Sequence, residues 1–275
     1  MKKLHFISGL PRSGSTLLSA ILRQNPSFYA GISSPVSGLF DSIISQLSAG
    51  SEFASMVNDQ QKQALLLGLF TAYYQEQADK RVVLDTNRAW CGRMSALNRL
   101  FPESKVICCV RNVAWVMDSL ERQYQQTPFD NTRLFNNTVE RNTVYSRVDT
   151  LAQRDRLVGF SWSVLKEAVY GPYANSLLLV DYDLLTRSPD AVMRLIYQFL
   201  NEPYFEHNFE TLEYDVPEFD QDLGLPGMHR VKAKVQPNNR ETILPPDLFE
   251  KYSDMSFWRD LTGSKANIIA PEKYN

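Results

Sequence analysis

The chain opens with the stretch Met1-Lys-Lys-Leu-His-Phe-Ile-Ser-Gly-Leu-Pro-Arg-Ser-Gly-Ser-Thr-Leu-Leu-Ser-Ala-Ile-Leu22. Its apolar residues first form a short run that is typical of a strand, and from Thr16 onward they recur at helical spacing. Between these two segments Gly9 and Gly14 predict a turn. A strand, a Gly-rich turn and a helix in this order form a cradle for phosphate. The N–H groups of the turn point inward, and the helix N-terminus carries about half a positive charge.

The turn reads Gly9-Leu-Pro-Arg-Ser-Gly14-Ser15-Thr16 and has the GxxxxG spacing of a P-loop. A nucleoside triphosphatase would need a Lys next, followed by Ser or Thr. Ser15 stands at the Lys position, so the triphosphatase pattern fits poorly, and the cation lies inside the loop as Arg12. The alternative is an ordinary Gly/Ser turn between a strand and a helix.

The residues Pro11, Arg12, Ser13, Gly14, Ser15 and Thr16 resemble the 5'-phosphosulfate loop of sulfotransferases that use 3'-phosphoadenosine 5'-phosphosulfate (PAPS). In that family Pro-Lys/Arg-Ser-Gly-Ser/Thr-Thr is typical, and an Arg as the loop cation is closest to bacterial relatives of the tyrosylprotein and heparan-type enzymes. The resemblance implies that these six residues bind PAPS and that Arg12 stabilises the leaving phosphate. It also implies adenosine 3',5'-bisphosphate as the spent product and no metal ion.

Composition limits the classes of function. With 275 residues, 44% hydrophobic and 22% charged, the chain suits one large globular domain. A net charge of −2 gives no basic field for nucleic acid, so anion binding requires a local pocket. Three cysteines form no disulfide framework and no long apolar run is present, so we expect a cytoplasmic protein without a membrane span. The three histidines lack metal-ligand spacing.

Apolar strands alternate with helices along the chain, which predicts an α/β fold with a parallel β-sheet flanked by helices on both faces. No linker divides the chain, so residues 1–275 are expected to form a single P-loop-like domain. Residues 24–38 and 202–222 read as loops, and residues 127–150 are polar with little periodicity. The expected strands are 4–7, 81–84, 105–110 and 176–180, and the expected helices are 16–22, 40–47, 60–78, 94–101, 113–125, 156–170, 188–200 and a short one after Pro246.

Ligands of parallel sheets bind at the carboxyl ends of the strands. Arg111 follows the strand 105–110, and Ser119 comes eight residues later. This pair resembles the 3'-phosphate site of sulfotransferases, and an Arg fork matches phosphate geometry. Tyr182 follows the strand 176–180 in a stretch similar to the Tyr-Glu-Asp-Leu segment whose Tyr lies against the adenine. A core tyrosine is the alternative for Tyr182.

A late stretch places Arg230, Lys232 and Lys234 at alternate positions, so an extended backbone would turn all three the same way. It looks like the basic loop that many sulfotransferases fold over the 3'-phosphate. Solvated surface charges are the alternative.

Asp85 ends the strand 81–84 and corresponds to the Glu of heparan-type enzymes, which makes it the candidate general base. The Lys often found beside this acid is Thr86 here, and the His of cytosolic sulfotransferases would be Asn87. A structural carboxylate paired with Arg88 or Arg12 is the alternative for Asp85.

Three functions compete: a PAPS-dependent sulfotransferase acting in line on an acceptor hydroxyl, a P-loop small-molecule kinase, and a non-catalytic nucleotide-binding protein of the same fold. The acceptor is expected to be a small molecule or a peptide. Segments 127–150 and 206–222 are the expected walls of its site, and the acidic second segment favours a basic or neutral acceptor. The oligomeric state is open.

Overall fold

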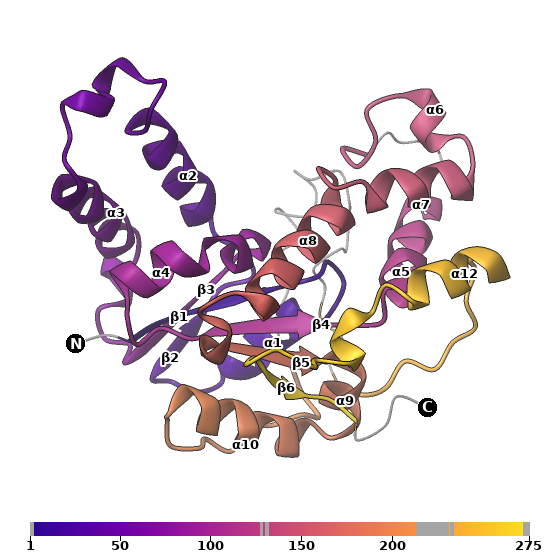
Figure 1. Ribbon diagram of the computed structural model, residues 1–275. Helices are drawn as coiled ribbons and strands as arrows, with labels where there is room; N and C mark the ends of the chain where they lie inside the picture. Colours follow the sequence, from indigo (N-terminus) through magenta and orange to yellow (C-terminus); the bar gives the residue numbers. More distant parts are fainter. Residues whose placement is uncertain (1–2, 127–128, 130–131, 213–230, 232–233, 272–275) are drawn as a thin grey trace.

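The computed structural model describes residues 3–126, 129, 132–212, 231 and 234–271. A six-stranded sheet runs through its centre, with the order β2-β3-β1-β4-β5-β6 and every pairing parallel (Figure 1). The strands are β1 (Lys3–Gly9), β2 (Phe28–Ala30), β3 (Val82–Thr86), β4 (Val106–Val110), β5 (Leu177–Asp181) and β6 (Asn267–Ile269). The predicted parallel sheet is confirmed.

Helices cover both faces of the sheet, as expected. The α-helices are α1 (Ser15–Leu22), α2 (Val36–Gln46), α3 (Asp59–Tyr73), α4 (Met94–Leu100), α5 (Val113–Gln125), α6 (Thr138–Arg141), α7 (Val144–Ala152), α8 (Leu157–Tyr170), α9 (Tyr182–Arg187), α10 (Pro189–Leu200) and α12 (Pro246–Ser253). Short 3-10 turns are η1 (Glu52–Ser55), η2 (Gln75–Gln77), η3 (Arg88–Arg93), η4 (Ala174–Ser176) and η5 (Phe257–Arg259).

Successive strand residues pack into two different cores, because side chains alternate across a strand. On β1, Phe6 joins α2, α3 and α8 in one core, whereas Ile7 joins α1, α9 and α10 in the other. Figure 1 shows α10 on one side of the sheet and α3, α4 and α8 on the other. Burial on both faces explains why the central strands read as continuous apolar runs rather than as alternating ones.

Several segments differ from the sequence-based expectation. The expected loop 24–38 contains β2 and the start of α2, and the polar segment 127–150 contains α6 and most of α7. The expected helix 188–200 is α10, which begins with Pro189 in its first turn, and the side chain of Ser188 makes no capping hydrogen bond to it. No helix in the described part of the chain is long and apolar enough to cross a membrane.

Candidate active site

The loop after β1 is held by backbone conformations that most residues avoid. Gly9 and Gly14 have φ of 133° and 96°, and Arg12 adopts the left-handed region with φ of 59°. A Cβ on Gly9 would lie 2.2 Å from the carbonyl oxygen of Cys109 on β4, so only glycine allows this close approach. The loop therefore turns tightly over the end of β4 and delivers the chain to the first turn of α1.

The N-terminus of α1 opens into a pocket. Its N-cap is Gly14, which has no side chain to cap the helix, and its first turn contains no acidic residue. Ser15 and Thr16 line the same pocket. The orphan N–H groups of this turn and the two hydroxyls can therefore donate to an anion.

Ser13 does not share this role through its side chain. It is fully buried, and its hydroxyl lies 2.5 Å from the carbonyl oxygen of Leu10 and 2.8 Å from that of Cys109. The hydroxyl anchors the loop to β4, which leaves only the backbone of Ser13 for the predicted contact with PAPS.

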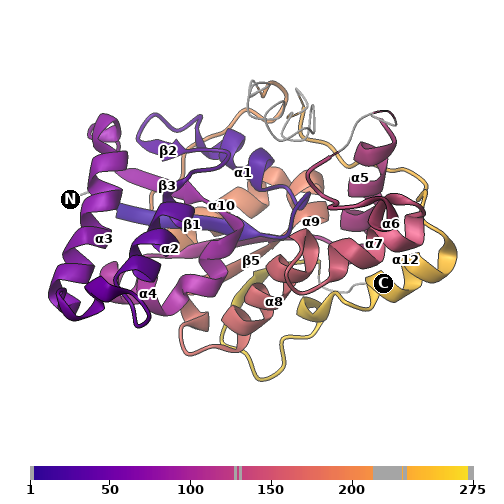
Figure 2. The same cartoon turned by 90° about the horizontal axis from the view of Figure 1, so that it is seen from above.

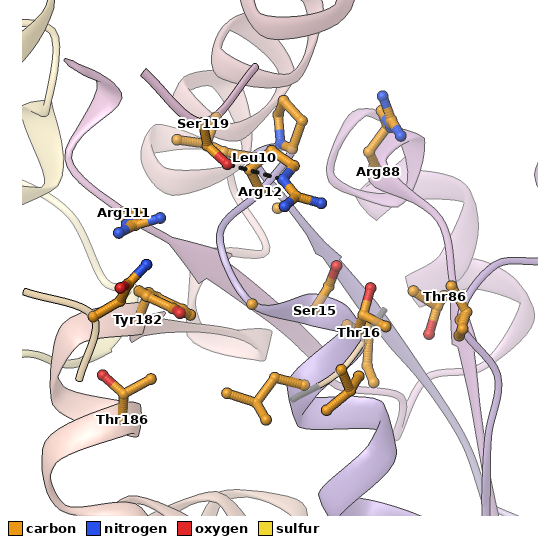
Figure 3. A pocket seen from close by; sticks show the side chains of 18 of the residues that line it. Leu10, Arg12, Ser15, Thr16, Thr86, Arg88, Arg111, Ser119, Tyr182 and Thr186 are labelled. Atoms are coloured by element: carbon orange, nitrogen blue, oxygen red, sulfur yellow. Dashed lines mark hydrogen bonds between the residues drawn. The ribbon is translucent and has the colours of Figure 1, made fainter. Parts of the chain in front are cut away.

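Three other predicted residues meet beside the loop (Figure 3). Arg12 Nε donates to Ser119 Oγ at 3.0 Å, although the two residues are 107 positions apart. Arg111 is 6% exposed, and its guanidinium lies 4.4 Å from the ring centroid of Tyr182. Its buried Nε has no hydrogen-bond partner among the residues that the structure describes. A Cβ on Gly14 would meet Tyr182 at 2.6 Å, so the ring packs directly against the loop. The ends of β1, β4 and β5 thus converge on one place.

The pocket over these residues has a volume of about 590 Å³, in the range of small-ligand sites. Among the described residues that line it are Arg12, Arg88, Arg111, Lys234 and Arg240, and none is Asp, Glu or His. In a chain of net charge −2, this local excess of cations is what an anionic ligand requires.

Asp85, the candidate base, is on β3 but faces the core. It is fully buried and does not line the pocket. Its oxygens accept hydrogen bonds from the hydroxyls of Ser34 (2.8 Å) and Tyr74 (2.6 Å) and from Trp90 Nε1 (2.7 Å). Burial raises the pKa of Asp85, and the three donors oppose that rise. The structure thus surrounds this carboxylate with neutral donors, not with the Arg12 or Arg88 partners considered from sequence.

The family model for sulfotransferases matches residues 5–206, which span the loop, Asp85, Arg111, Ser119 and Tyr182. The chain belongs to the sulfotransferase family. Comparison with curated protein sequences found no significant match.

Solved sulfotransferase structures share its fold. The sulfotransferase domain of the Synechococcus PCC 7002 olefin synthase is 20% identical with a TM-score of 0.52, and the match covers 94% of this chain and 97% of that one. The domain from the curacin biosynthetic pathway is 17% identical (TM-score 0.51; 93% and 92% covered), and the Alicyclobacillus acidocaldarius sulfotransferase is 13% identical (TM-score 0.53; 81% and 90% covered).

The late basic stretch of this sulfotransferase is only partly described. Arg230 and Lys232 lie outside the described residues. Lys234 does line the pocket, and its Nζ lies 2.5 Å from a carboxylate oxygen of Glu210, with both side chains at least half exposed. An exposed pair of this kind is weak, so Lys234 can exchange Glu210 for another anion.

Arg240 lines the pocket although sequence reasoning did not select it. Its guanidinium lies 2.5 Å from the buried carboxylate of Asp118 on α5, the helix that carries Ser119. Arg122 also contacts Asp118, so two arginines share one carboxylate and the group keeps a net positive charge. A single Arg in a polar segment has no period or motif by which a sequence could reveal this role.

The described residues of the two expected acceptor walls do not line this pocket. No described residue of 127–150 lines it. Helix α7 packs against α5, where Arg147 pairs with the buried Glu121. Of the segment 206–222, only residues 206–212 are described.

Proposed function

We propose that this sulfotransferase moves a sulfuryl group from PAPS to an acceptor hydroxyl. The observation that carries the proposal is Arg111, a buried guanidinium without an ion-pair partner among the described residues, stacked on Tyr182 beside the loop. Burying an unpaired charge is costly, so such a group indicates an anionic ligand. A nucleotide with a 3'-phosphate and a 5'-phosphosulfate supplies anions at both ends of this arrangement.

Each part of the site has a role in this proposal. Arg111 and Ser119 bind the 3'-phosphate with support from Arg240, and Tyr182 contacts the adenine. The N-terminus of α1, with Ser15 and Thr16, binds the 5'-phosphosulfate. Arg12 stabilises the charge that develops on the leaving phosphate.

The reaction is a single displacement. The acceptor oxygen forms a bond to sulfur while the bond from sulfur to the 5'-phosphate oxygen breaks, and that oxygen keeps the electron pair. The hydroxyl proton is released, so PAPS and an alcohol yield adenosine 3',5'-bisphosphate, a sulfate ester and a proton. Asp85 stays the sequence-based prediction for the base, although the structure gives it no exposure to the pocket.

Calorimetric titration with adenosine 3',5'-bisphosphate tests the proposal. We expect binding by the wild-type protein, and about tenfold to hundredfold weaker binding by Arg111→Ala and Ser119→Ala, because each loses a charge-assisted hydrogen bond. Arg99→Ala, an exposed change on α4, is the matched control and should bind normally.

Titrations with ATP, in magnesium and in EDTA, distinguish a sulfotransferase from a kinase. A kinase would bind ATP better than the bisphosphate and would depend on the metal. Wild-type protein that binds ATP but not adenosine 3',5'-bisphosphate would refute the proposed function.

A further inference from the structure

The pocket residues follow the order of the strands along the sheet edge. Tyr182 follows β5, Arg111 follows β4, the phosphate loop follows β1, and Arg88 follows β3. Figure 3 shows the same order across the site, with Arg12 between Arg111 and Arg88. In the proposed binding mode, adenine, 3'-phosphate and 5'-phosphate occupy the first three positions. The group beyond the 5'-phosphate therefore lies toward β3 and Arg88.

Arg88 lacks the partners that the other pocket cations have. Arg12 donates to Ser119, Arg240 pairs with Asp118, Lys234 pairs with Glu210, and Arg111 stacks on Tyr182. No hydrogen bond, ion pair or ring contact joins the Arg88 guanidinium to any other described residue, although the side chain is half-buried in the pocket wall. Burial lowers the pKa of Arg88, as expected for a desolvated cation without a counter-charge.

The backbone that carries Arg88 is fixed in place. Ser8 Oγ on β1 donates to the carbonyl oxygen of Arg88 at 2.9 Å, and Asn87 Oδ1 caps the η3 turn by accepting from Ala89 N at 3.0 Å. Two residues further on, Trp90 is tied to Asp85. The backbone from which the Arg88 side chain extends is thus held on the β3 side of the pocket, close to the expected place of the transferred group.

We propose that Arg88 binds the sulfuryl group that is transferred, a role that rests on the proposed function. The donor carries one negative charge on this group, and the cations assigned to the two phosphates are Arg111, Arg240 and Arg12. As sulfur moves from the phosphate oxygen to the acceptor oxygen, its three other oxygens keep their negative charge. Arg88 therefore stabilises the group before, during and after transfer, and makes the protein prefer PAPS over the spent bisphosphate.

The test compares the affinities of the wild-type protein, Arg88→Gln and Arg88→Lys for fresh PAPS and for adenosine 3',5'-bisphosphate, measured by calorimetry without an acceptor. We expect Arg88→Gln to bind PAPS about tenfold to hundredfold more weakly and the bisphosphate about as well as wild type. Arg88→Lys keeps the charge but not the fork, so a smaller loss for PAPS is expected. Arg93→Gln, on the same η3 turn but paired with Asp41 at the surface, is the matched control.

The two ligands separate the possible failures. Wild-type protein that binds neither nucleotide would refute the proposed function itself. If the wild-type protein binds both nucleotides, and Arg88→Gln weakens the binding of both equally or of neither, the role of Arg88 alone would be overturned. Thermal unfolding of Arg88→Gln without ligand should match wild type, because no described partner is lost. If Arg88→Gln does not fold, Arg88→Lys replaces it. The ratio of its affinities for PAPS and for adenosine 3',5'-bisphosphate should then be lower than that of the wild-type protein.

Discussion

Asp85 lies near the end of β3, where a general base was expected, but its carboxylate is buried and does not line the pocket. Ser34, Tyr74 and Trp90 come from the loop after β2, from the end of α3 and from the η3 turn, and all three donate to it. Ser33 and Arg88, neighbours of these donors, line the pocket. The hydrogen bonds of Asp85 therefore connect the core to the β3 side of the site, and its geometry fits a positioning residue.

We expect Asp85→Asn to lower the free energy of unfolding by about 1–3 kcal/mol, because the amide would turn an N–H group toward buried donors. Urea denaturation measures this loss, and Ser34→Ala, which removes a single donor, should cost less. Acceptor-dependent turnover measured on the same samples tests the base hypothesis. An unchanged unfolding midpoint together with abolished turnover would contradict the positioning role and support Asp85 as the base.

At the scale of elements, the phosphate loop and α9 form one unit. Asp181 at the end of β5 caps α9 by accepting from Leu184 N at 3.0 Å, so the helix begins at Tyr182 itself. This start directs the Tyr182 ring onto Gly14, the N-cap of α1. The proposed adenine and 5'-phosphate subsites are thus in direct contact, and a change in one should alter the other.

Gly14→Ala tests that contact. The alanine would hold a left-handed φ, and its Cβ would displace Tyr182, so we expect a destabilisation of about 1–3 kcal/mol and weaker binding of adenosine 3',5'-bisphosphate. Gly38→Ala in α2 is the control, because no atom lies within 4 Å of the added Cβ. That change should stabilise the protein by up to about 1 kcal/mol. Wild-type affinity in Gly14→Ala would show that the ring and the loop act independently.

At the scale of the whole molecule, stability should depend on pH through His5. It is buried on β1, and its Nδ1 accepts from the backbone N–H of Lys105 at 3.0 Å, so this nitrogen must stay unprotonated. Burial, with the nearby charges of Lys3 and Lys105, lowers the pKa of His5 from 6.5 to about 4. Between these pH values the unfolded chain takes up a proton that the folded protein does not.

The free energy of unfolding should therefore fall as the pH drops from about 6.5 to 4, by up to about 3 kcal/mol from His5, and be unaffected by this group above 6.5. Denaturation across this pH range measures the slope. His5→Asn keeps an acceptor for Lys105 but does not titrate, so its slope should be shallower. Identical slopes for both proteins would exclude His5 as the origin.

The sequence alone determined the features that depend on local geometry. Glycines at 9 and 14 predicted the turn because only they adopt its backbone angles easily, and apolar periodicity gave α5 with the same ends as the structure, Val113 to Gln125. The rule that ligands bind at the carboxyl ends of parallel strands drew attention to Arg111 and Tyr182, and the resemblance to sulfotransferases added Ser119. The three residues do lie together. Arg111 and Tyr182 follow well-formed strands, so their approximate place could be predicted without distances.

Only the tertiary structure decided which of these side chains reach the pocket. β2 and β6 contain three residues each, too few for a pattern, and their partners in the sheet hold them in place. Ser13 and Asp85 turn into the core, whereas Arg88 and Arg240 enter the pocket, and no local signal distinguishes these cases. The direction of a side chain depends on strand register and on packing against residues far away in the chain. The strand ends were therefore predictable from sequence, whereas the contacts made there were not.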